Sequence, residues 1–342
     1  MTPATWPRSD ALEGRLLWLE PRTGKMADAQ VRDLARMLRP GDLLVVNDAA
    51  TLPASYCASW PGHDPVEVRL AGPACAGRWR LVLFGAGDWR QGTGERPAPP
   101  RPAIGDVLTL GEGLTATIEQ VSPVSPRLVE VEFNVEGAQL WSLLYSHGKP
   151  VQYRYADDEL AAWHVQTPFG GRPWAVEMPS AGRPLQWALL LALKRAGVRL
   201  ATVTHAAGLS ATGDPALDRA LPLPERFEVP AATVEAIAAT RGAGGRIVAV
   251  GTSVVRALES ANVLGGGRLV AVCGETDLRI GPGFVPRVAD GILTGMHESG
   301  ESHYDLLEAF APAALLNRAT AHAESAGYVG HEFGDSTLIL AA

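Results

Sequence analysis

The chain has 342 residues, of which 46% are hydrophobic and 20% charged, and its formal net charge is −7. This is the composition of a folded globular protein with enough apolar material for two domains, and its acidic balance provides no general basic field for nucleic acid. Three widely separated cysteines, no signal-peptide core and no long apolar run predict a cytoplasmic protein without a disulfide framework or a membrane span.

The first part of the chain has an α/β pattern. Arg15–Glu20 predicts a strand, and Asp28–Leu38 predicts a helix with Asp28 as its N-cap, because its apolar residues have helical spacing. The next strand, Leu43–Val46, is continuously apolar and leads into Asn47 and Asp48. Polar groups at the carboxyl end of such a strand are where open α/β sheets bind ligands.

The pattern changes in the next ninety residues or so. Short segments that alternate polar and apolar residues follow one another between Gly- and Pro-rich breaks, which predicts a small antiparallel β-barrel or sandwich. We therefore expect an α/β main domain made of residues 1–60 and 150–342, with a β-barrel module at 61–149 inserted into it. The segments are VEVRL, RWRLVLF, DVLTL, TATIEQV and RLVEVEF.

The α/β pattern returns after Pro150. Helices and strands alternate to the end of the chain, and no internal repeat is present. The expected helices cover 185–197, 231–245, 253–262 and 303–323, and the expected strands cover 198–206, 246–251, 269–280 and 337–340.

The segment GRIVAVGTSVVRALES predicts a strand that runs into a helix at Gly251, Thr252 and Ser253. Hydroxyls and free backbone N–H groups at a helix start favour an anionic ligand group. The alternative is a capped surface helix on which Arg256 and Glu259 form a charge pair.

Histidines occupy two other expected strand ends. His205 ends the strand before a glycine-containing loop, and His297 follows the apolar segment GILTG. Asp335 precedes the last strand, where a carboxylate can act as a base or accept a ribose hydroxyl, or can simply form a turn with Gly334. No HxxxH or HExxH pattern is present, so no metal is expected.

The order of several motifs resembles one family. RLLWL, PGDLLVVND, GKPVQYRY, VQTPFGGRPWAVEMPSAG, ERFEV, RIVAVGTSVVRALESA, DGILTGMH, DLLEAFA and FGDSTLIL resemble, in sequence and nearly in spacing, the S-adenosylmethionine:tRNA ribosyltransferase-isomerases of queuosine biosynthesis. The resemblance extends over nearly the whole chain from Arg15. It implies an α/β domain combined with a small β-barrel, as the patterns themselves predict.

The resemblance implies a reaction in which S-adenosylmethionine is a ribosyl donor. A base removes a proton from C5′, adenine and methionine leave, and the aminomethyl nitrogen of a 7-deazaguanine in tRNA receives an epoxycyclopentanediol. We assign the groups that this chemistry needs from their positions at strand ends, helix starts and close turns. The expected catalytic residues are His205, His297, Asp335 and Glu259, and the expected S-adenosylmethionine-binding residues are Asn47, Asp48, Ser180, Gly182, Gly251, Thr252, Ser253, Arg256 and Asp290.

The chain departs from the family pattern at several points. Ala49-Ala50 stands where Thr-Arg is usual, Ser55 where an arginine is usual, and Arg183-Pro184 where Leu-His is usual. The segment 298–301 has two glutamates in place of a lysine-containing sequence. Several of these changes remove positive charge that an RNA phosphate would attract.

Three hypotheses follow. The first is a ribosyltransferase-isomerase that acts on the deazaguanine of tRNA or on another acceptor. The second is a related S-adenosylmethionine-consuming lyase or transferase with a small-molecule acceptor, and the third is a non-catalytic S-adenosylmethionine-binding protein. Weak binding to bulk tRNA is expected unless the arginines of the β module form a local patch, and the sequence does not indicate an oligomeric state.

Overall fold

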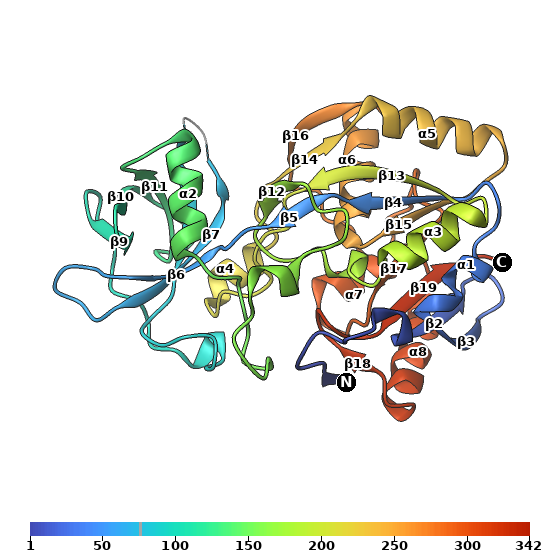
Figure 1. The fold of residues 1–342 in the computed structure, drawn as a ribbon, viewed down its shortest axis with the longest axis horizontal. Coiled ribbons are helices and arrows are strands. Elements are labelled where there is room, and N and C mark those ends of the chain that lie inside the picture. The colour runs from blue at the N-terminus through green and yellow to red at the C-terminus, as the bar shows by residue number, and fades with distance from the viewer. Residues whose placement is uncertain (75–76) are drawn as a thin grey trace.

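A computed structural model describes residues 1–74 and 77–342. They form two parts that lie side by side, one built on a nine-stranded sheet and the other on a six-stranded antiparallel sheet (Figure 1). The six-stranded sheet begins at Ser55, before the expected boundary at residue 60, and the helix packed on it ends at His147. The larger part is therefore assembled from both ends of the chain, with the smaller part inserted between them.

The larger part is organised around four adjacent parallel strands, β13, β4, β15 and β17. Antiparallel pairings join β14 to β13 and β19 to β17. In spatial order the nine strands are β16 (Val272–Thr276), β14 (Glu225–Val229), β13 (Arg199–His205), β4 (Leu43–Asn47), β15 (Ile247–Val250), β17 (Gly291–Gly295), β19 (Ser336–Leu340), β2 (Arg15–Glu20) and β3 (Lys25–Gln30).

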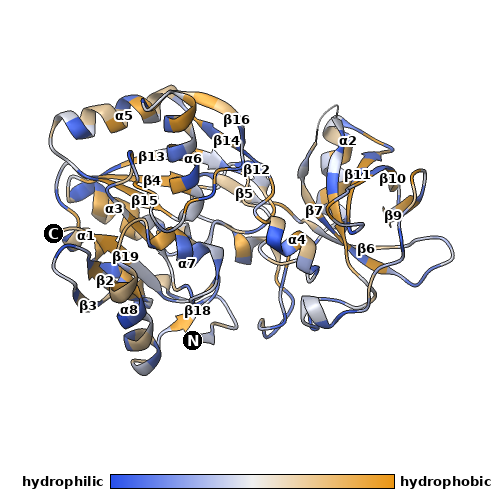
Figure 2. Cartoon of the chain, turned by 180° about the vertical axis from the view of Figure 1, so that it is seen from behind, coloured by the Kyte–Doolittle hydropathy of each residue, from blue (hydrophilic) through white to orange (hydrophobic). Residues whose placement is uncertain are grey.

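The central strands are apolar throughout because helices cover both faces of the sheet. In β4, Leu43 and Val45 belong to the core on one face, whereas Leu44 and Val46 belong to the core on the other. Figure 2 shows the hydrophobic residues concentrated along these strands and along the six-stranded sheet. One face is covered by α5 (Ala231–Gly242), α6 (Thr252–Leu264), α7 (Ser302–Leu307) and α8 (Ala313–Ser325), and the other by α1 (Leu34–Met37) and α3 (Trp187–Arg195).

The smaller part is a nearly closed antiparallel barrel. Its two edge strands meet through a bridge between Ser59 and Thr109, and α2 (Gly137–His147) packs Leu140 and Leu144 into its core. Val176 from the larger part extends the same core. In spatial order the strands are β6 (Ser55–Ala58), β7 (Val66–Pro73), β8 (Trp79–Leu83), β11 (Leu128–Phe133), β10 (Leu114–Val121) and β9 (Val107–Gly111).

Several short elements lie outside the two large sheets. β5 pairs in parallel with β12, β1 pairs in parallel with β18, and α4 follows the loop after β13. Their bounds are β5 (Ala49–Thr51), β12 (Arg172–Ala175), β1 (Thr2–Pro3), β18 (Val329–Gly330) and α4 (Pro215–Ala220), and 3-10 turns occur at Ala11–Glu13, Val31–Asp33, Thr93–Glu95, Ala162–Val165 and Ser180–Gly182.

The prediction of a helix at 28–38 is largely wrong. Lys25–Gln30 forms β3 instead, and only Leu34–Met37 is α-helical. Asp28 is no N-cap, because its carboxylate accepts a hydrogen bond from the hydroxyl of Tyr328 at 2.6 Å. Pairing with β2 along the full length of β3 therefore overrides the helical spacing of the apolar residues.

The single helix expected at 303–323 is two helices. α7 ends at Leu307 and α8 begins after Pro312, whose ring prevents hydrogen bonding through its nitrogen. The sequence analysis did not predict α2, since its amphipathic segment follows directly after the alternating strands.

Candidate active site

The carboxyl ends of the four parallel strands form one edge of the main sheet, and the arrows of β4 and β13 in Figure 1 point toward the barrel. His205 ends β13, Asn47 ends β4, Gly251 follows β15, and His297 lies two residues after β17. The structure thus brings four of the expected residues to one edge, where open α/β sheets bind ligands.

Asn47 joins three elements of this edge. Its side-chain amide donates to the carbonyl of His205 at 2.9 Å and to Oγ of Ser253 at 3.3 Å. Its side-chain oxygen accepts from the backbone N–H groups of His205 and Ala49. Because both ends of the amide are engaged, Asn47 orients the neighbouring groups of β13 and α6.

Asp48 and the two alanines after it connect this edge to the next loop. The carboxylate of Asp48 accepts from the hydroxyl of Thr204 at 2.5 Å, and its backbone carbonyl accepts from Gly171 N–H at 2.9 Å. Ala49 and Ala50 belong to β5, which pairs with β12. These alanines are therefore parts of a small sheet at the edge.

His205 is buried among charged groups and only 1% exposed. Its Nε2 lies 3.4 Å from Oε2 of Glu225, yet within residues 1–74 and 77–342 neither ring nitrogen has a hydrogen-bond partner. Burial, and next the positive charge of Arg256, hold the pKa of His205 well below its ordinary value. The imidazole is therefore neutral near pH 7 and has a lone pair that can accept a proton.

Glu225 and Arg256 form the buried ion pair beside this histidine. Nη1 of Arg256 binds the Glu225 carboxylate, and its Nε donates to the carbonyl of Leu278 at 3.1 Å. Burial raises the pKa of Glu225, although Arg256 acts in the opposite direction. In the described part of the chain Nη2 of Arg256 has no partner. The charge pair between Arg256 and Glu259, which was the alternative interpretation, does not form.

The start of α6 has backbone N–H groups that are not used in the helix. Gly251 precedes it with a φ of 95°, a conformation that favours glycine, and makes no side-chain cap. No acceptor for the N–H groups of Thr252 and Ser253 occurs within the described ranges. A Cβ atom on Gly251 would lie 3.3 Å from Cβ of Ala181, so the turn Ser180–Gly182 packs directly against this helix start.

A pocket lies between this turn and the segment before β19. Gly182 must be glycine there, because a Cβ atom would lie 2.7 Å from the ring of Phe169. Ser180 borders the pocket, as do charged groups on both sides of it. The polar and charged lining residues are Arg8, Ser180, Arg183, His331, Glu332, Asp335 and Ser336.

Asp335 is buried and fully hydrogen-bonded. Its carboxylate accepts from Nη2 of Arg8 at 2.7 Å and from the backbone N–H groups of Arg15 and Val329, each at 2.9 Å. These contacts tie the N-terminal segment to the start of β19. Asp335 therefore borders the pocket as an anchor, with little freedom to act as a base.

Glu259, expected to be catalytic, and Asp290, expected to bind S-adenosylmethionine, lie away from the other expected site residues. Glu259 is fully buried two turns into α6, and it accepts from the backbone N–H groups of Arg287 and Val288. Asp290 accepts from Ile247 N–H at the amino end of β15. Both residues therefore lie at the amino edge of the sheet, whereas His205 lies at the carboxyl edge. We no longer expect either residue to contact S-adenosylmethionine.

His297 lies at the carboxyl edge but in a different environment from His205. Its Nε2 is 2.9 Å from the hydroxyl of Thr294, and its ring stacks on that of His303 with centroids 5.1 Å apart. Glu301 is 3.7 Å from Nδ1. This histidine is oriented by neighbours from β17, α7 and the loop between them, three strands away from His205.

A second pocket lies between the two parts of the chain. Ala71, Arg80 and Val82 from the barrel form one wall, and Trp174 and Glu225 from the main part belong to the other. Glu225, whose carboxylate lies 3.4 Å from Nε2 of His205, therefore belongs both to this pocket and to the surroundings of the buried histidine.

The sequence analysis missed Glu225, Glu177 and Tyr153. The carboxylate of Glu177 accepts from the Tyr153 hydroxyl and from Ser210 N–H at 3.0 Å, and burial raises its pKa to about 7. The motifs GKPVQYRY and VQTPFGGRPWAVEMPSAG contain two of these residues, but contributed only to the resemblance. Tyr153 lies three residues after the expected domain boundary at residue 150, and this position was the available signal.

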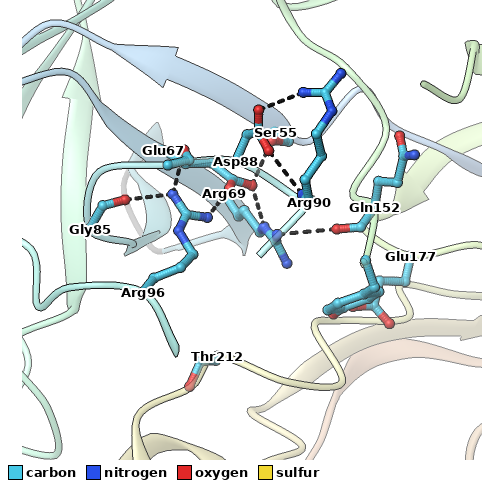
Figure 3. Close-up of polar contacts among 12 residues, drawn as sticks. Ser55, Glu67, Arg69, Gly85, Asp88, Arg90, Arg96, Gln152, Glu177 and Thr212 are labelled. Atoms are coloured by element: carbon cyan, nitrogen blue, oxygen red, sulfur yellow. Dashed lines mark hydrogen bonds and ion pairs between the residues drawn. The ribbon is translucent and has the colours of Figure 1, made fainter. Parts of the chain in front are cut away.

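A buried cluster of charges is centred on Glu67, Arg69 and Arg96 (Figure 3). The Glu67 carboxylate accepts hydrogen bonds from Arg69, Arg96 and the hydroxyl of Ser55. Arg69 also donates to the carbonyl of Gln152, and its guanidinium lies 5.1 Å from the Tyr153 ring. Position 55, where the family pattern has an arginine, is therefore next to two buried guanidinium groups from elsewhere in the chain.

Two further observations concern the whole described chain. No helix within residues 1–74 and 77–342 is long and apolar enough to cross a membrane. Over the same ranges, no three His, Cys, Asp or Glu side chains are grouped so that they could hold a metal ion.

Comparison with known proteins gives a consistent result. A family model described as queuosine biosynthesis protein matches residues 2–339. The S-adenosylmethionine:tRNA ribosyltransferase-isomerase of Synechococcus sp. (strain RCC307) is 35% identical over 95% of this chain and 89% of its own length. The protein of the same name from Acidithiobacillus ferrooxidans is 33% identical over 97% and 93%, respectively.

A solved structure is similar over almost the same length. The crystal structure of the S-adenosylmethionine tRNA ribosyltransferase from Thermotoga maritima matches with a TM-score of 0.54 and 25% sequence identity. The match covers 99% of this chain and 96% of that one. The similarity therefore includes both the sheet with the candidate site and the inserted part.

Proposed function

The chain belongs to the queuosine biosynthesis protein family, and we propose that it is an S-adenosylmethionine:tRNA ribosyltransferase-isomerase whose reaction centre lies beside His205. The enzyme transfers the ribosyl part of S-adenosylmethionine to the aminomethyl nitrogen of a 7-deazaguanine in tRNA. Adenine and methionine are released. S-Adenosylmethionine is a co-substrate in this reaction and is consumed.

The main support is the state of His205. It is a buried, neutral imidazole at a strand end, and neither ring nitrogen is engaged by a hydrogen bond within the described residues. A general base needs a free lone pair and must reach the proton that it removes. We assign to His205 the removal of the proton from C5′, which the adjacent sulfonium acidifies.

The start of α6 supports the donor assignment. The free N–H groups and hydroxyls of Thr252 and Ser253 suit the oxygen atoms of a ribose, and Asn47 holds Ser253 next to His205. Loss of the C5′ proton opens the ribose and breaks its bond to adenine. The acceptor amine then forms the new C–N bond, methionine is expelled, and the epoxycyclopentanediol remains on the base.

The acceptor approaches through the pocket between the two parts. That pocket is lined by both the barrel and the main sheet, and Glu225 connects it to His205. Excluding water from such an enclosed space protects the reactive intermediate from hydrolysis. This arrangement supports an acceptor held by its base, with the rest of the RNA outside the pocket.

Incubation with S-adenosylmethionine and tRNA that carries the 7-aminomethyl-7-deazaguanine tests the proposal. We expect mass spectrometry to detect adenine, methionine and modified tRNA in equal amounts, and none of them when the tRNA is omitted. The His205→Gln variant should release far less of each product than the His63→Gln variant, whose histidine is exposed on the barrel.

The same assay separates the alternatives. Adenine release from S-adenosylmethionine with a small acceptor, but not with tRNA, would replace the tRNA substrate by a small molecule. Ligand-induced thermal stabilisation without any product would indicate a binding protein, since binding to the native state alone raises the melting temperature.

A further inference from the structure

Among the residues that the structure describes, Arg183 is a cation without an anionic partner. It follows the turn Ser180–Gly182, and its guanidinium lies 5.2 Å from the centre of the Phe333 ring. Its Nε makes one long hydrogen bond, 3.4 Å to the carbonyl of His164, and no carboxylate in residues 1–74 or 77–342 is within ion-pair distance. Burial lowers the pKa of Arg183. A partly buried guanidinium in such surroundings is stabilised when a ligand brings a negative charge.

The same pocket contains a carboxylate, that of Glu332, without an oppositely charged partner in the described chain. Glu332 accepts a hydrogen bond from the hydroxyl of Tyr155, but within the described chain it has no cationic partner. The other two charges of the lining, Arg8 and Asp335, neutralise each other at 2.7 Å. The pocket therefore presents one free positive and one free negative group.

We propose that this pocket binds the zwitterionic end of an α-amino acid, with its carboxylate on Arg183 and its ammonium on Glu332. The inference rests on the proposed function, in which that amino acid is the methionine part of S-adenosylmethionine. Bidentate contact between a guanidinium and a carboxylate, together with a charge-assisted hydrogen bond to the ammonium, recognises this end group and no neutral analogue.

The location agrees with this assignment. Ala181 borders the pocket and packs against Gly251, so the pocket adjoins the start of α6. Gly295, at the end of β17, also borders it. β13 and β17 are three strand spacings apart, which corresponds to roughly 14 Å. A molecule that reaches both His205 and this pocket must be extended, with a reactive carbon and an amino-acid group at some distance from each other.

An RNA phosphate fits the pocket less well than a zwitterion. Two carboxylates, Glu332 and Asp335, belong to the lining and would repel a phosphate. The two lining arginines and these two carboxylates cancel in formal charge. A ligand end with one positive and one negative group is therefore the better electrostatic match.

Isothermal titration calorimetry with three ligands tests the Arg183 contact and the Glu332 contact separately. S-Adenosylmethionine has both groups, decarboxylated S-adenosylmethionine has only the ammonium, and 5′-methylthioadenosine has neither. We expect Arg183→Leu to weaken S-adenosylmethionine about tenfold or more and to leave the other two ligands within about twofold. Glu332→Gln should weaken the first two ligands but not 5′-methylthioadenosine. Arg36→Leu, on a residue whose side chain is 88% exposed, is the matched control.

The outcomes distinguish this inference from the proposed function. Unchanged affinity of Arg183→Leu for S-adenosylmethionine would overturn the inference, as would an equal loss for all three ligands or a loss confined to tRNA. Wild-type protein that binds neither S-adenosylmethionine nor 5′-methylthioadenosine would overturn the proposed function itself. Should Arg183→Leu fail to fold, Arg183→Gln provides the same comparison with a polar side chain of similar length.

Discussion

The Nε2 atom of His205 lies 3.4 Å from the carboxylate oxygen of Glu225 that also binds Arg256. Groups from β13, β14 and α6 therefore meet at one buried oxygen. Because the guanidinium already compensates the carboxylate, Glu225 does not stabilise a protonated imidazole, and burial keeps His205 neutral. A charge pair thus maintains a base in its reactive form.

Replacement of His205 by Gln should lower turnover by about a hundredfold or more, as expected for the loss of a general base. The affinity for S-adenosylmethionine and the melting temperature should change little, since Gln retains most of the side-chain volume. His63→Gln is the control. A large fall in the melting temperature of His205→Gln, with activity reduced only in proportion to the folded fraction, would instead identify a packed structural histidine.

Replacement of Arg256 by Met should strongly destabilise the fold. It leaves Glu225 buried without a partner, which costs about 3–5 kcal/mol in comparable ion pairs. Chemical denaturation measures this loss, and the double variant Arg256→Met/Glu225→Gln should recover part of it. Arg154→Met, which breaks an exposed pair with Glu95, should cost at most about 1 kcal/mol. A double variant no more stable than Arg256→Met would contradict this explanation.

The sequence predicted those features of the site that depend on local pattern. An uninterrupted apolar run identifies β4 because both faces of that strand are buried, and polar residues directly after such runs identify Asn47 and His205 as edge groups. A glycine between a strand and a helix likewise predicts the start of α6. These inferences need only the direction of each strand.

Features that depend on distant partners were not predictable. Arg256 and Glu259 are one turn apart and suggested a pair, but α6 is buried on all sides at this level, so each finds its own partner elsewhere. Asp290 and His297 occur in one motif, yet they flank a five-residue strand, and such a strand is roughly 16 Å long. Only one of the two can lie at the carboxyl edge.

Glu177 should make the stability of the protein depend on pH. Burial raises its pKa from 4.5 to about 7, so the folded state retains a proton that the unfolded state has lost. The resulting contribution to stability is complete below pH 4.5 and is lost as the pH rises through 7. We therefore expect wild type to lose unfolding free energy relative to Glu177→Gln as the pH rises from 4.5 to 7.

Denaturation at several pH values between 4 and 8 measures that difference. The buried His205 titrates in the opposite sense, because its lowered pKa removes stability as the pH falls below 6.5, but it is present in both proteins and cancels. A difference that stays constant from pH 4 to pH 8 would show that the pKa of Glu177 is not raised in the folded protein.

The arginines of the barrel do not form a free basic patch. Arg69 and Arg96 are buried and form ion pairs with Glu67. Three exposed or partly exposed arginines of the barrel have acidic neighbours as well. The three further pairs are Arg78–Glu130 at 3.9 Å, Arg80–Glu275 at 3.1 Å and Arg90–Asp88 at 2.6 Å. Five of these arginines therefore have an acidic neighbour, although Arg69 and Arg96 share the single charge of Glu67.

We accordingly expect tRNA affinity to depend only weakly on salt. Each phosphate that a Lys or Arg neutralises contributes roughly −0.9 to the logarithmic slope on duplex RNA or DNA and about −0.7 on a single strand. The net charge is −7 and the barrel arginines are paired. The slope should therefore correspond to no more than about three such phosphate contacts. Fluorescence titration of tRNA at several salt concentrations measures it, and Arg90→Gln should leave it unchanged because Asp88 already compensates that charge. A slope near −6 or steeper would mean that the RNA backbone, and not the base in the pocket between the two parts, provides most of the binding.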